Sequence, residues 1–560
     1  MRNLRVFACF VVLTCFLASP SISEASKIIH NVKGYTPTQQ GGQTFDALLI
    51  GDDGRVLSIG TATSLFSQSP GAKRVDGAGA TLIPGLIDSH AHVMGLGEAS
   101  LQIDLRGTKS LDEALERVKA FAAENPDLAW IRGRGWNQEV WQLGRFPTAA
   151  ELDKAVADRP VWLSRVDGHA AWANTRALTI ASVSAETADP SGGEIIRADD
   201  GAPAGVFIDA AEALVARHIP PLSSRERRQA FTNALEIMTS VGITTVHDAG
   251  TSPQDWALFN KFAYSGKLTT RIYAMIAGTD DTFDRLARGG PIEGLKDDLL
   301  AMRSVKLYAD GALGSRGAAL NAAYSDKPES KGLLFNTDEE LAAKVQKAAS
   351  RGFQVNIHAI GDRANRQALD IFAGLPDRQS ASVLRHRVEH AQIVDPADFE
   401  RFASLGVIAS VQPTHATSDK NMAETRLGPE RIKGAYAWRR FLDAGVRIAA
   451  GSDFPVELPD PLHGIQAAVA RTDLAGEPVG GWYVGEALTL EEAIRAFTLG
   501  GAYAAFWEDR VGSLEPGYWA DFILLDQDIF AIPATEIGKI KVLETWLAGE
   551  QVYDRDKGAE

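Results

Sequence analysis

The chain has 560 residues, of which 45% are hydrophobic and 23% charged. A single hydrophobic core stops growing near about 250–300 residues, so more than one domain is expected. The composition is that of a folded soluble protein and excludes a disordered or fibrous chain. The formal net charge of −15 argues against nucleic acid or an anionic membrane as the main partner, because both attract clustered Lys and Arg.

The N-terminal segment, residues 1–25, differs from the rest of the chain. Two arginines precede the apolar run Val6–Ala18, and Ala25 completes a pattern of small residues typical of a cleavage site. These features predict a signal peptide cleaved near Ala25 and a secreted or periplasmic protein, with an uncleaved anchor as the alternative. Both cysteines, Cys9 and Cys15, lie in this segment, so the mature chain would have neither disulfides nor thiolate chemistry.

The two ends of the remaining chain share a β-rich pattern. Residues 26–83 contain short apolar runs separated by turn signals such as Asp52–Gly54, and residues 490–560 contain similar runs such as Phe522–Leu525. Short β-branched and apolar runs between turn residues are typical of strands. We therefore expect the two ends to pair into one small β-sandwich domain.

Residues 84–489 alternate between strand and helix patterns. Eight apolar or β-branched segments stand out: Leu86–Val93, Gly242–Gly250, Arg271–Ala277, Ser304–Gly311, Gln354–Gly361, Arg385–Gln392, Gly406–Pro413 and Val446–Asp453. Strands that are buried on both faces form continuous hydrophobic runs, and eight of them separated by helices are typical of a (β/α)₈ TIM barrel. The first gap is far longer than a connection needs, so about residues 100–225 should form an inserted subdomain over the barrel mouth.

Polar side chains stand at the ends of five of the eight predicted strands. In chain order they are His90, His92, Lys306, His358, His390 and Asp453. The C-terminal ends of barrel strands face one mouth, and imidazoles at positions i and i+2 point to the same side of a strand. Each residue alone has a structural explanation, such as a hydrogen-bonded core histidine, a salt-bridged lysine or an aspartate that caps a helix. Their joint occurrence predicts a metal site.

The sequence also resembles a known family. The segments Pro84–His92 and Gly512–Asp521, with the strand-end polar residues, resemble the amidohydrolase superfamily over nearly the whole mature chain. Within the superfamily the chain is similar to the amidohydrolase 3 branch, which includes N-substituted formamide deformylases. Four further segments carry that closer resemblance: Asp167–Asn174, Gly242–Asp248, Asp310–Arg316 and His358–Asp362.

The resemblance implies a metal-dependent hydrolase with one or two zinc ions, other divalent metals remaining open. His90 and His92 would hold the first metal, and His358 and His390 the second. Lys306 would bridge the two metals as an N6-carboxylated lysine, because a buried neutral lysine can react with CO₂ and the product is an anion. Sequence alone leaves the number of bound metals open.

Catalysis and substrate binding would involve five residues. Asp453 would bind metal and take the proton from the attacking water, and Lys306 would act through its carbamate. His169 and Trp172 in the insertion, and Arg316 after the fourth strand, are candidates for substrate binding. For the aromatic residues of the insertion, plain core packing is an equally good interpretation, and Arg316 could instead cap a helix.

The leading hypothesis is an amidohydrolase that cleaves C–N bonds of amide, N-formyl or cyclic amide substrates by metal-activated water. An isomerase, a lyase or an ester hydrolase on the same scaffold is the first alternative, because fold does not fix function. A catalytically inactive binding or regulatory homologue is the second. We expect a small-molecule substrate, no nucleic acid, no membrane after removal of the signal, and leave a homo-oligomer open.

Overall fold

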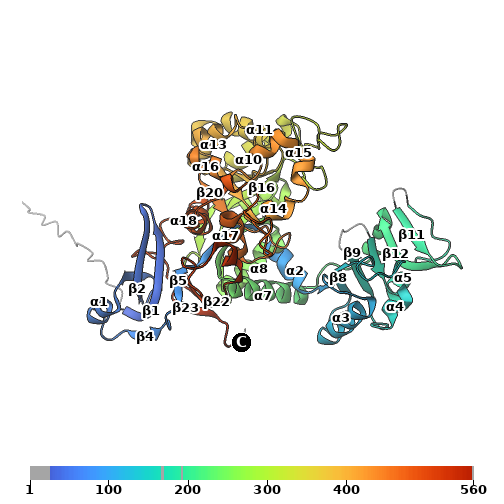
Figure 1. The fold of residues 1–560 in the computed structure, drawn as a ribbon, viewed down its shortest axis with the longest axis horizontal. Helices are drawn as coiled ribbons and strands as arrows, with labels where there is room; N and C mark the ends of the chain where they lie inside the picture. The colour runs from blue at the N-terminus through green and yellow to red at the C-terminus, as the bar shows by residue number, and fades with distance from the viewer. Residues whose placement is uncertain (1–24, 166–169, 191–192, 558–560) are drawn as a thin grey trace, which may run out of the picture.

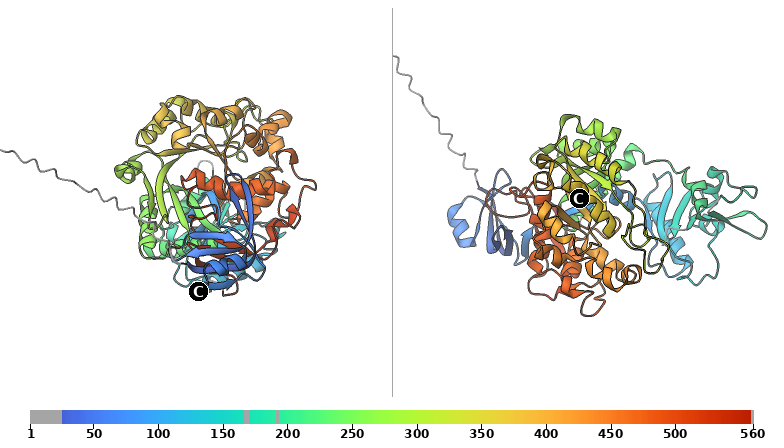
Figure 2. Two further views of the ribbon diagram at one scale, coloured as in Figure 1. Left: turned by 90° about the vertical axis from the view of Figure 1, so that its left-hand side faces the viewer. Right: turned by 90° about the horizontal axis from the view of Figure 1, so that it is seen from above.

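A computed structural model describes residues 25–165, 170–190 and 193–557. Three regions lie in a row in Figure 1: a β domain, a central barrel and the insertion. The right-hand view of Figure 2 shows the same order. Nearly all of the expected signal peptide, residues 1–24, lies outside the described residues. Within the described part of the chain, no helix combines the length and the apolar character that a membrane span needs.

Eight parallel strands form the central sheet and follow one another in chain order. They are β6 (Leu86–Ala91), β13 (Ile243–Thr251), β14 (Arg271–Ala277), β16 (Leu300–Tyr308), β17 (Gln354–Ala359), β18 (Arg387–His390), β19 (Ile408–Val411) and β20 (Ile448–Ala450). A short strand, β15 (Ile292–Leu295), pairs antiparallel with β16. Each of the eight strands overlaps one predicted segment, so the (β/α)₈ barrel is confirmed.

The barrel closes where the chain after β20 meets β6. A Cβ on Gly451 would lie 2.5 Å from Asp88 Oδ1 and 2.6 Å from His90 N, so only glycine permits this close approach. The Ser452 hydroxyl donates to Asp88 Oδ2 at 2.6 Å. The backbone N–H of Asp453 donates to the carbonyl oxygen of His90 at 2.7 Å. This seam places Asp453 beside the histidines of β6.

Helices surround the barrel. They are α2 (Val93–Ser100), α7 (Ser224–Ser240), α8 (Pro253–Tyr264), α9 (Asp281–Leu286), α10 (Asp338–Ala349), α11 (Asp362–Ala373), α12 (Ala381–Leu384), α13 (Phe399–Leu405), α14 (Pro413–Asp419), α15 (Ala423–Arg431), α16 (Trp438–Asp443), α17 (Pro461–Ala470), α18 (Leu490–Arg495), the π-helical turn η6 (Ala496–Gly500) and α19 (Gly501–Ala504). In α10, the Thr337 side chain accepts a hydrogen bond from Glu340 N and caps the first turn. Leu341, Val345 and Ala348 then recur at helical spacing and pack into the core.

The insertion folds around its own six-stranded sheet, in the order β11-β12-β10-β9-β8-β7. Its elements are β7 (Ile103–Asp104), α3 (Leu111–Glu124), β8 (Ile131–Trp136), α4 (Ala149–Asp153), β9 (Val161–Arg165), β10 (Ala170–Ala173), α5 (Thr175–Ala181), β11 (Gly193–Arg197), β12 (Pro203–Asp209) and α6 (Ala213–Ala216). The chain runs from β6 through α2 into this sheet. The insertion therefore lies at the end of the barrel where the strands terminate, opposite the β domain (Figure 1).

Both ends of the chain build the β domain, as expected. Its elements are β1 (Ala25–Thr38), β2 (Gly41–Gly51), β3 (Val56–Gly60), α1 (Ala62–Gln68), β4 (Lys73–Asp76), β5 (Thr81–Pro84), β21 (Phe522–Leu525), β22 (Val542–Leu547) and β23 (Glu550–Asp554). Their hydrogen-bond ladder is continuous, because β1 pairs with β4 before a register shift between His30 and Gly34 and with β5 after it.

The boundary of the C-terminal part of the β domain differs from the expected residue 490. The π-helical turn η6 and helix α19, which together span residues 496–504, pack against barrel strands β6 and β20. Their apolar side chains, such as Phe497, belong to the same core cluster as the barrel strands. This segment therefore completes the barrel, and the strands of the β domain resume only at β21.

Candidate metal centre

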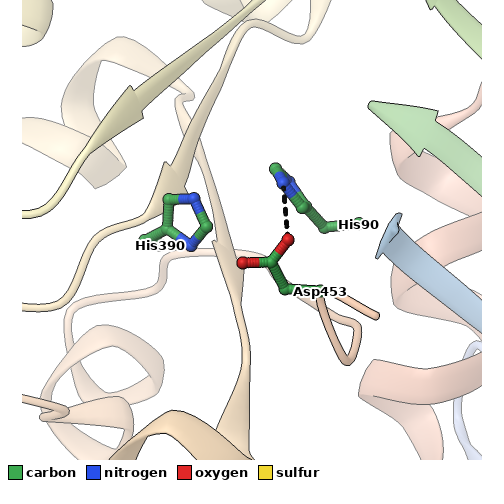
Figure 3. Close-up of side chains that lie close together, drawn as sticks. All are labelled: His90, His390 and Asp453. Carbon is green, nitrogen blue, oxygen red and sulfur yellow. Dashed lines mark ion pairs between the residues drawn. The ribbon is translucent and has the colours of Figure 1, made fainter. Parts of the chain in front are cut away.

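Polar side chains converge at the C-terminal ends of five barrel strands. His90 is on β6 and His92 directly follows it, Lys306 comes from β16, His358 from β17, His390 from β18 and Asp453 from the turn after β20. Ligand atoms of His90, His390 and Asp453 lie within 4.8 Å of one another. Figure 3 shows these three side chains close together. His92 Nε2 lies 3.2 Å from Asp453 Oδ1, and the rings of His358 and His390 have centroids 4.5 Å apart.

Lys306 reaches the same cluster. Its side chain is buried, and its Nζ lies 3.0 Å from His90 Nε2. Burial lowers the pKa of Lys306 to about 8, which increases the share of neutral, nucleophilic amine near neutral pH. The structure thus brings together all six residues that the sequence predicted as metal ligands.

Two of these residues have unusual backbone conformations. His390 has a φ of 75° and Asp453 a φ of 63°, both in the left-handed region. Residues other than glycine rarely adopt this backbone conformation, which raises the free energy of the folded state by on the order of 1–3 kcal/mol per residue. Such residues cluster at functional sites. The conformation of His390 is accompanied by a hydrogen bond of 2.8 Å between its Nδ1 and Oε1 of Gln412. The local backbone is therefore bent so that both side chains face the cluster.

The protonation of the cluster suits metal binding. Burial and nearby cationic groups lower the pKa of His90 to about 4 and that of His358 to about 3, and they lower the pKa of His390 well below its usual value. Burial alone would raise the pKa of Asp453, but the close contact with His92 and the neighbouring histidines hold that pKa well below the usual range. Neutral imidazoles and an ionised carboxylate are the forms that bind metal.

Unsatisfied polar atoms indicate that the cluster fits a divalent metal ion. Among the described residues, His358 Nε2 and Asp453 Oδ1 are buried and have no hydrogen-bond partner. Buried polar atoms are normally paired, so these two are available for another ligand. Imidazole nitrogens and a carboxylate oxygen are the donor set that zinc takes in catalytic sites. The unmodified Nζ of Lys306 lies 3.0 Å from His90 Nε2, so this side chain belongs to the same group of possible ligands.

Four further polar residues support this cluster, and three of them, Glu389, His415 and Gln412, had no assignment from the sequence. The Glu389 carboxylate accepts a hydrogen bond from Nδ1 of His90. His415 Nε2 lies 3.6 Å from Asp453 Oδ2, and Gln412 contacts His390. Asp310 accepts backbone hydrogen bonds from three residues, including Ile360 N at 2.9 Å and Gly361 N at 2.8 Å, and thereby fixes the turn after β17.

A cavity of about 870 Å³ opens beside the cluster. His92 and Lys306 line its inner end, and Leu307, Tyr308 and Phe335 contribute apolar walls further out. Tyr308 and Phe335 are among the exposed large hydrophobic residues, at 43% and 52% exposure. A cavity of similar volume, about 890 Å³, lies outside the barrel between α7, α8 and β23 and contains none of the six clustered residues. Of these two cavities, the one at the cluster is therefore the candidate substrate site.

The three residues predicted to bind substrate have different outcomes. His169 lies outside the described residues. For Trp172 the structure favours the alternative of core packing over substrate binding. Its side chain is fully buried in the core of the insertion, and its Nε1 donates to the carbonyl oxygen of Thr148 at 2.9 Å. Arg316 forms an ion pair of 2.8 Å with Asp326 and is not among the residues that line the cavity in the described part of the chain.

Comparison with known proteins agrees with this geometry. Residues 73–553 match the amidohydrolase family. A protein named as an amidohydrolase, YtcJ of Bacillus subtilis, is 33% identical over 93% of this chain and 98% of its own length. An N-substituted formamide deformylase of Arthrobacter pascens is 29% identical over 90% of this chain and 94% of its own. The crystal structure of an uncharacterized metal-dependent hydrolase from Pyrococcus horikoshii has a TM-score of 0.75 at 29% identity, covering 91% of this chain and 99% of that one. The chain therefore belongs to the amidohydrolase family.

Proposed function

We propose that the protein is a zinc-dependent hydrolase that cleaves the C–N bond of a small amide or N-formyl amine. The observation that carries this proposal is the convergence of four histidines, one lysine and one aspartate at the barrel mouth, next to a cavity of about 870 Å³. Zinc bound by such ligands supplies a water of lowered pKa and a polarised carbonyl group. The name of the Arthrobacter pascens relative supports a C–N bond as the target.

In this proposal, Asp453 transfers the proton. Its carboxylate is ionised, and its Oδ1 lies 3.2 Å from His92 Nε2 but accepts no hydrogen bond from the residues that the structure describes. It can therefore accept a proton from the attacking water and return it to the departing amine, as a general base and then a general acid do. His415 Nε2 lies 3.6 Å from Oδ2, the other carboxylate oxygen of Asp453.

Lys306 has a structural role in the proposed centre. Addition of CO₂ to its neutral Nζ, with loss of one proton, gives a carbamate anion. In the structure, the unmodified amine of Lys306 lies 3.0 Å from His90 Nε2. The carbamate would instead offer two oxygen atoms to cations. Burial of Lys306 favours the neutral amine that this addition needs.

The cavity indicates which amides fit. Its walls beyond the cluster include Leu307, Tyr308 and Phe335, so an apolar or aromatic group attached to the amide can be removed from water there. Burial of apolar area contributes roughly 25 cal/mol per Å². We therefore propose a substrate whose amide or formamide group lies at the cluster and whose apolar substituent lies along these walls.

A metal-dependent substrate screen tests the proposed function. The purified protein is stripped with a chelator, reloaded with zinc, and assayed with N-formyl amines, N-acyl amines, cyclic amides and the matching esters. We expect turnover of at least one C–N substrate that disappears on stripping and returns with zinc. Full turnover without metal would contradict the proposal, and so would conversion of esters alone, or isomerisation or elimination without hydrolysis of any amide.

A further inference from the structure

A buried ion pair lies directly beneath the metal-binding cluster. Arg387 and Glu389 are both on β18, and each is 0% exposed. Because they are two positions apart on one strand, their side chains point to the same side, toward the interior of the barrel. Two charged side chains in this position are costly unless they are fully paired. Their contacts show how they are paired.

Glu389 joins the ion pair to a candidate metal ligand. Its Oε2 accepts hydrogen bonds from His90 Nδ1 and from Arg387 Nη2, the latter at 2.9 Å. Its Oε1 lies 2.7 Å from Arg387 Nε. An ionised carboxylate can only accept hydrogen bonds, so the proton between Glu389 and His90 resides on Nδ1 of the imidazole.

Arg387 fixes the position of that carboxylate. Besides Glu389, its guanidinium donates to His247 Nδ1 at 2.9 Å, to the carbonyl oxygen of Ser89 at 2.5 Å and to the Ser410 hydroxyl at 2.8 Å. These partners belong to β13, β6 and β19, so one guanidinium ties together four strands of the barrel. The planar, multidentate guanidinium suits such a fixed arrangement better than a lysine would.

We infer that Glu389 and Arg387 are positioning residues for the metal ligand His90. The pair holds His90 in the tautomer that carries its proton on Nδ1, and thereby directs the unprotonated Nε2 into the cluster. A carboxylate on the far nitrogen of a ligating histidine both orients the ring and strengthens it as a ligand. The inference rests on the proposed metal centre, and it adds a function for two residues that contact neither substrate nor metal.

Zinc affinity of the Glu389→Gln protein tests the inference. The amide group of the glutamine turns its NH₂ toward either Arg387 or His90, so one of the two contacts of the carboxylate is lost. We expect zinc to bind about 10–100-fold more weakly than in the wild type, measured by competition with a chromophoric chelator. Wild-type protein that binds no zinc would overturn the proposed centre itself, whereas equal zinc affinity in both proteins would overturn the inference alone.

A matched control separates positioning from folding. Asp521 forms an equally buried ion pair with Arg271, through hydrogen bonds of 2.7 and 3.0 Å, at the junction with the β domain. Asp521→Asn should lower the melting temperature of the metal-free protein as Glu389→Gln does, with zinc affinity unchanged within about twofold. An equal loss of zinc affinity in both variants would reduce Glu389 to a structural role and contradict the inference.

A shorter carboxylate gives a second variant that is easier to fold. Glu389→Asp retains the negative charge next to Arg387 but withdraws its oxygens from His90 by about one C–C bond length, since it lacks one methylene group. We expect this variant to melt close to the wild type and still to bind zinc at least tenfold more weakly. Wild-type zinc affinity in Glu389→Asp would overturn the inference even if Glu389→Gln did not fold.

Discussion

The barrel mouth and the core of the insertion both contain buried polar side chains, and the tryptophans of the insertion are paired differently from the clustered residues of the barrel mouth. In the insertion, the indole N–H groups of Trp136, Trp141 and Trp172 each donate to a backbone carbonyl oxygen, at 2.7, 3.2 and 2.9 Å. At the barrel mouth, His358 Nε2 and Asp453 Oδ1 are buried and form no hydrogen bond with the described part of the chain. Satisfied buried groups stabilise a fold, whereas unsatisfied ones in a native protein indicate a missing ligand or a chemical role.

The largest expected effect is at Asp453. Asp453→Asn keeps the size of the side chain but removes the ionised carboxylate that we propose as proton carrier. We expect kcat to fall by about 10²–10⁴-fold, with most of the bound metal and a near-native melting temperature retained, as measured by steady-state kinetics, metal analysis and a thermal melt. Asp280→Asn, which lines the same cavity but only caps α9, is the control and should keep normal kcat. A proportionate loss of stability and activity in Asp453→Asn would contradict the assigned role.

The next effect concerns Lys306. Lys306→Ala removes the proposed bridging carbamate, so both metal content and turnover should fall, turnover by at least about tenfold, the low end of losses seen when metal-site partners are removed. Because the missing group is a small anion, added short-chain carboxylic acid should partly restore turnover. Unchanged metal content, or a loss that follows the melting temperature alone, would make Lys306 a buried salt-bridge residue.

The fold and the site differ in how far sequence could predict them. The eight barrel strands were predictable because burial on both faces leaves continuous apolar runs such as Gln354–Ala359. The six clustered residues were predictable because strand ends of a parallel barrel share one mouth. The role of Trp172 was not, since an aromatic residue in a core and one in a pocket have the same local pattern. Glu389 was missed, although its opposite charge to Arg387 two positions earlier in a buried strand was a usable signal.

A smaller effect is expected in the insertion. Trp172→Phe removes the indole N–H that donates to the Thr148 carbonyl oxygen and leaves a small void. The stability of the protein should fall by about 1–3 kcal/mol, with KM unchanged, as a denaturant titration and steady-state kinetics will show. If Trp172 contacted substrate, KM would rise while stability stayed the same. That result would contradict the assignment of the insertion's tryptophans to its core.

The smallest effect is expected at Arg316. Its guanidinium pairs with Asp326, which Arg426 also contacts, so Arg316→Gln leaves that carboxylate with one cation. Partly exposed ion pairs contribute about 0–1 kcal/mol, and we expect a slightly lower melting temperature with unchanged KM. A tenfold rise in KM would return Arg316 to the substrate site.

Anomalous X-ray diffraction from crystals of the zinc-loaded protein tests the central claim most directly. Data collected on the two sides of the zinc absorption edge locate the metal without reference to activity. We predict an anomalous peak at the mouth of the barrel, within bonding distance of His90, His390 and Asp453, the three residues whose ligand atoms already lie within 4.8 Å of one another. A zinc-loaded crystal with no peak at this position, or with its peak elsewhere on the molecule, would contradict the account.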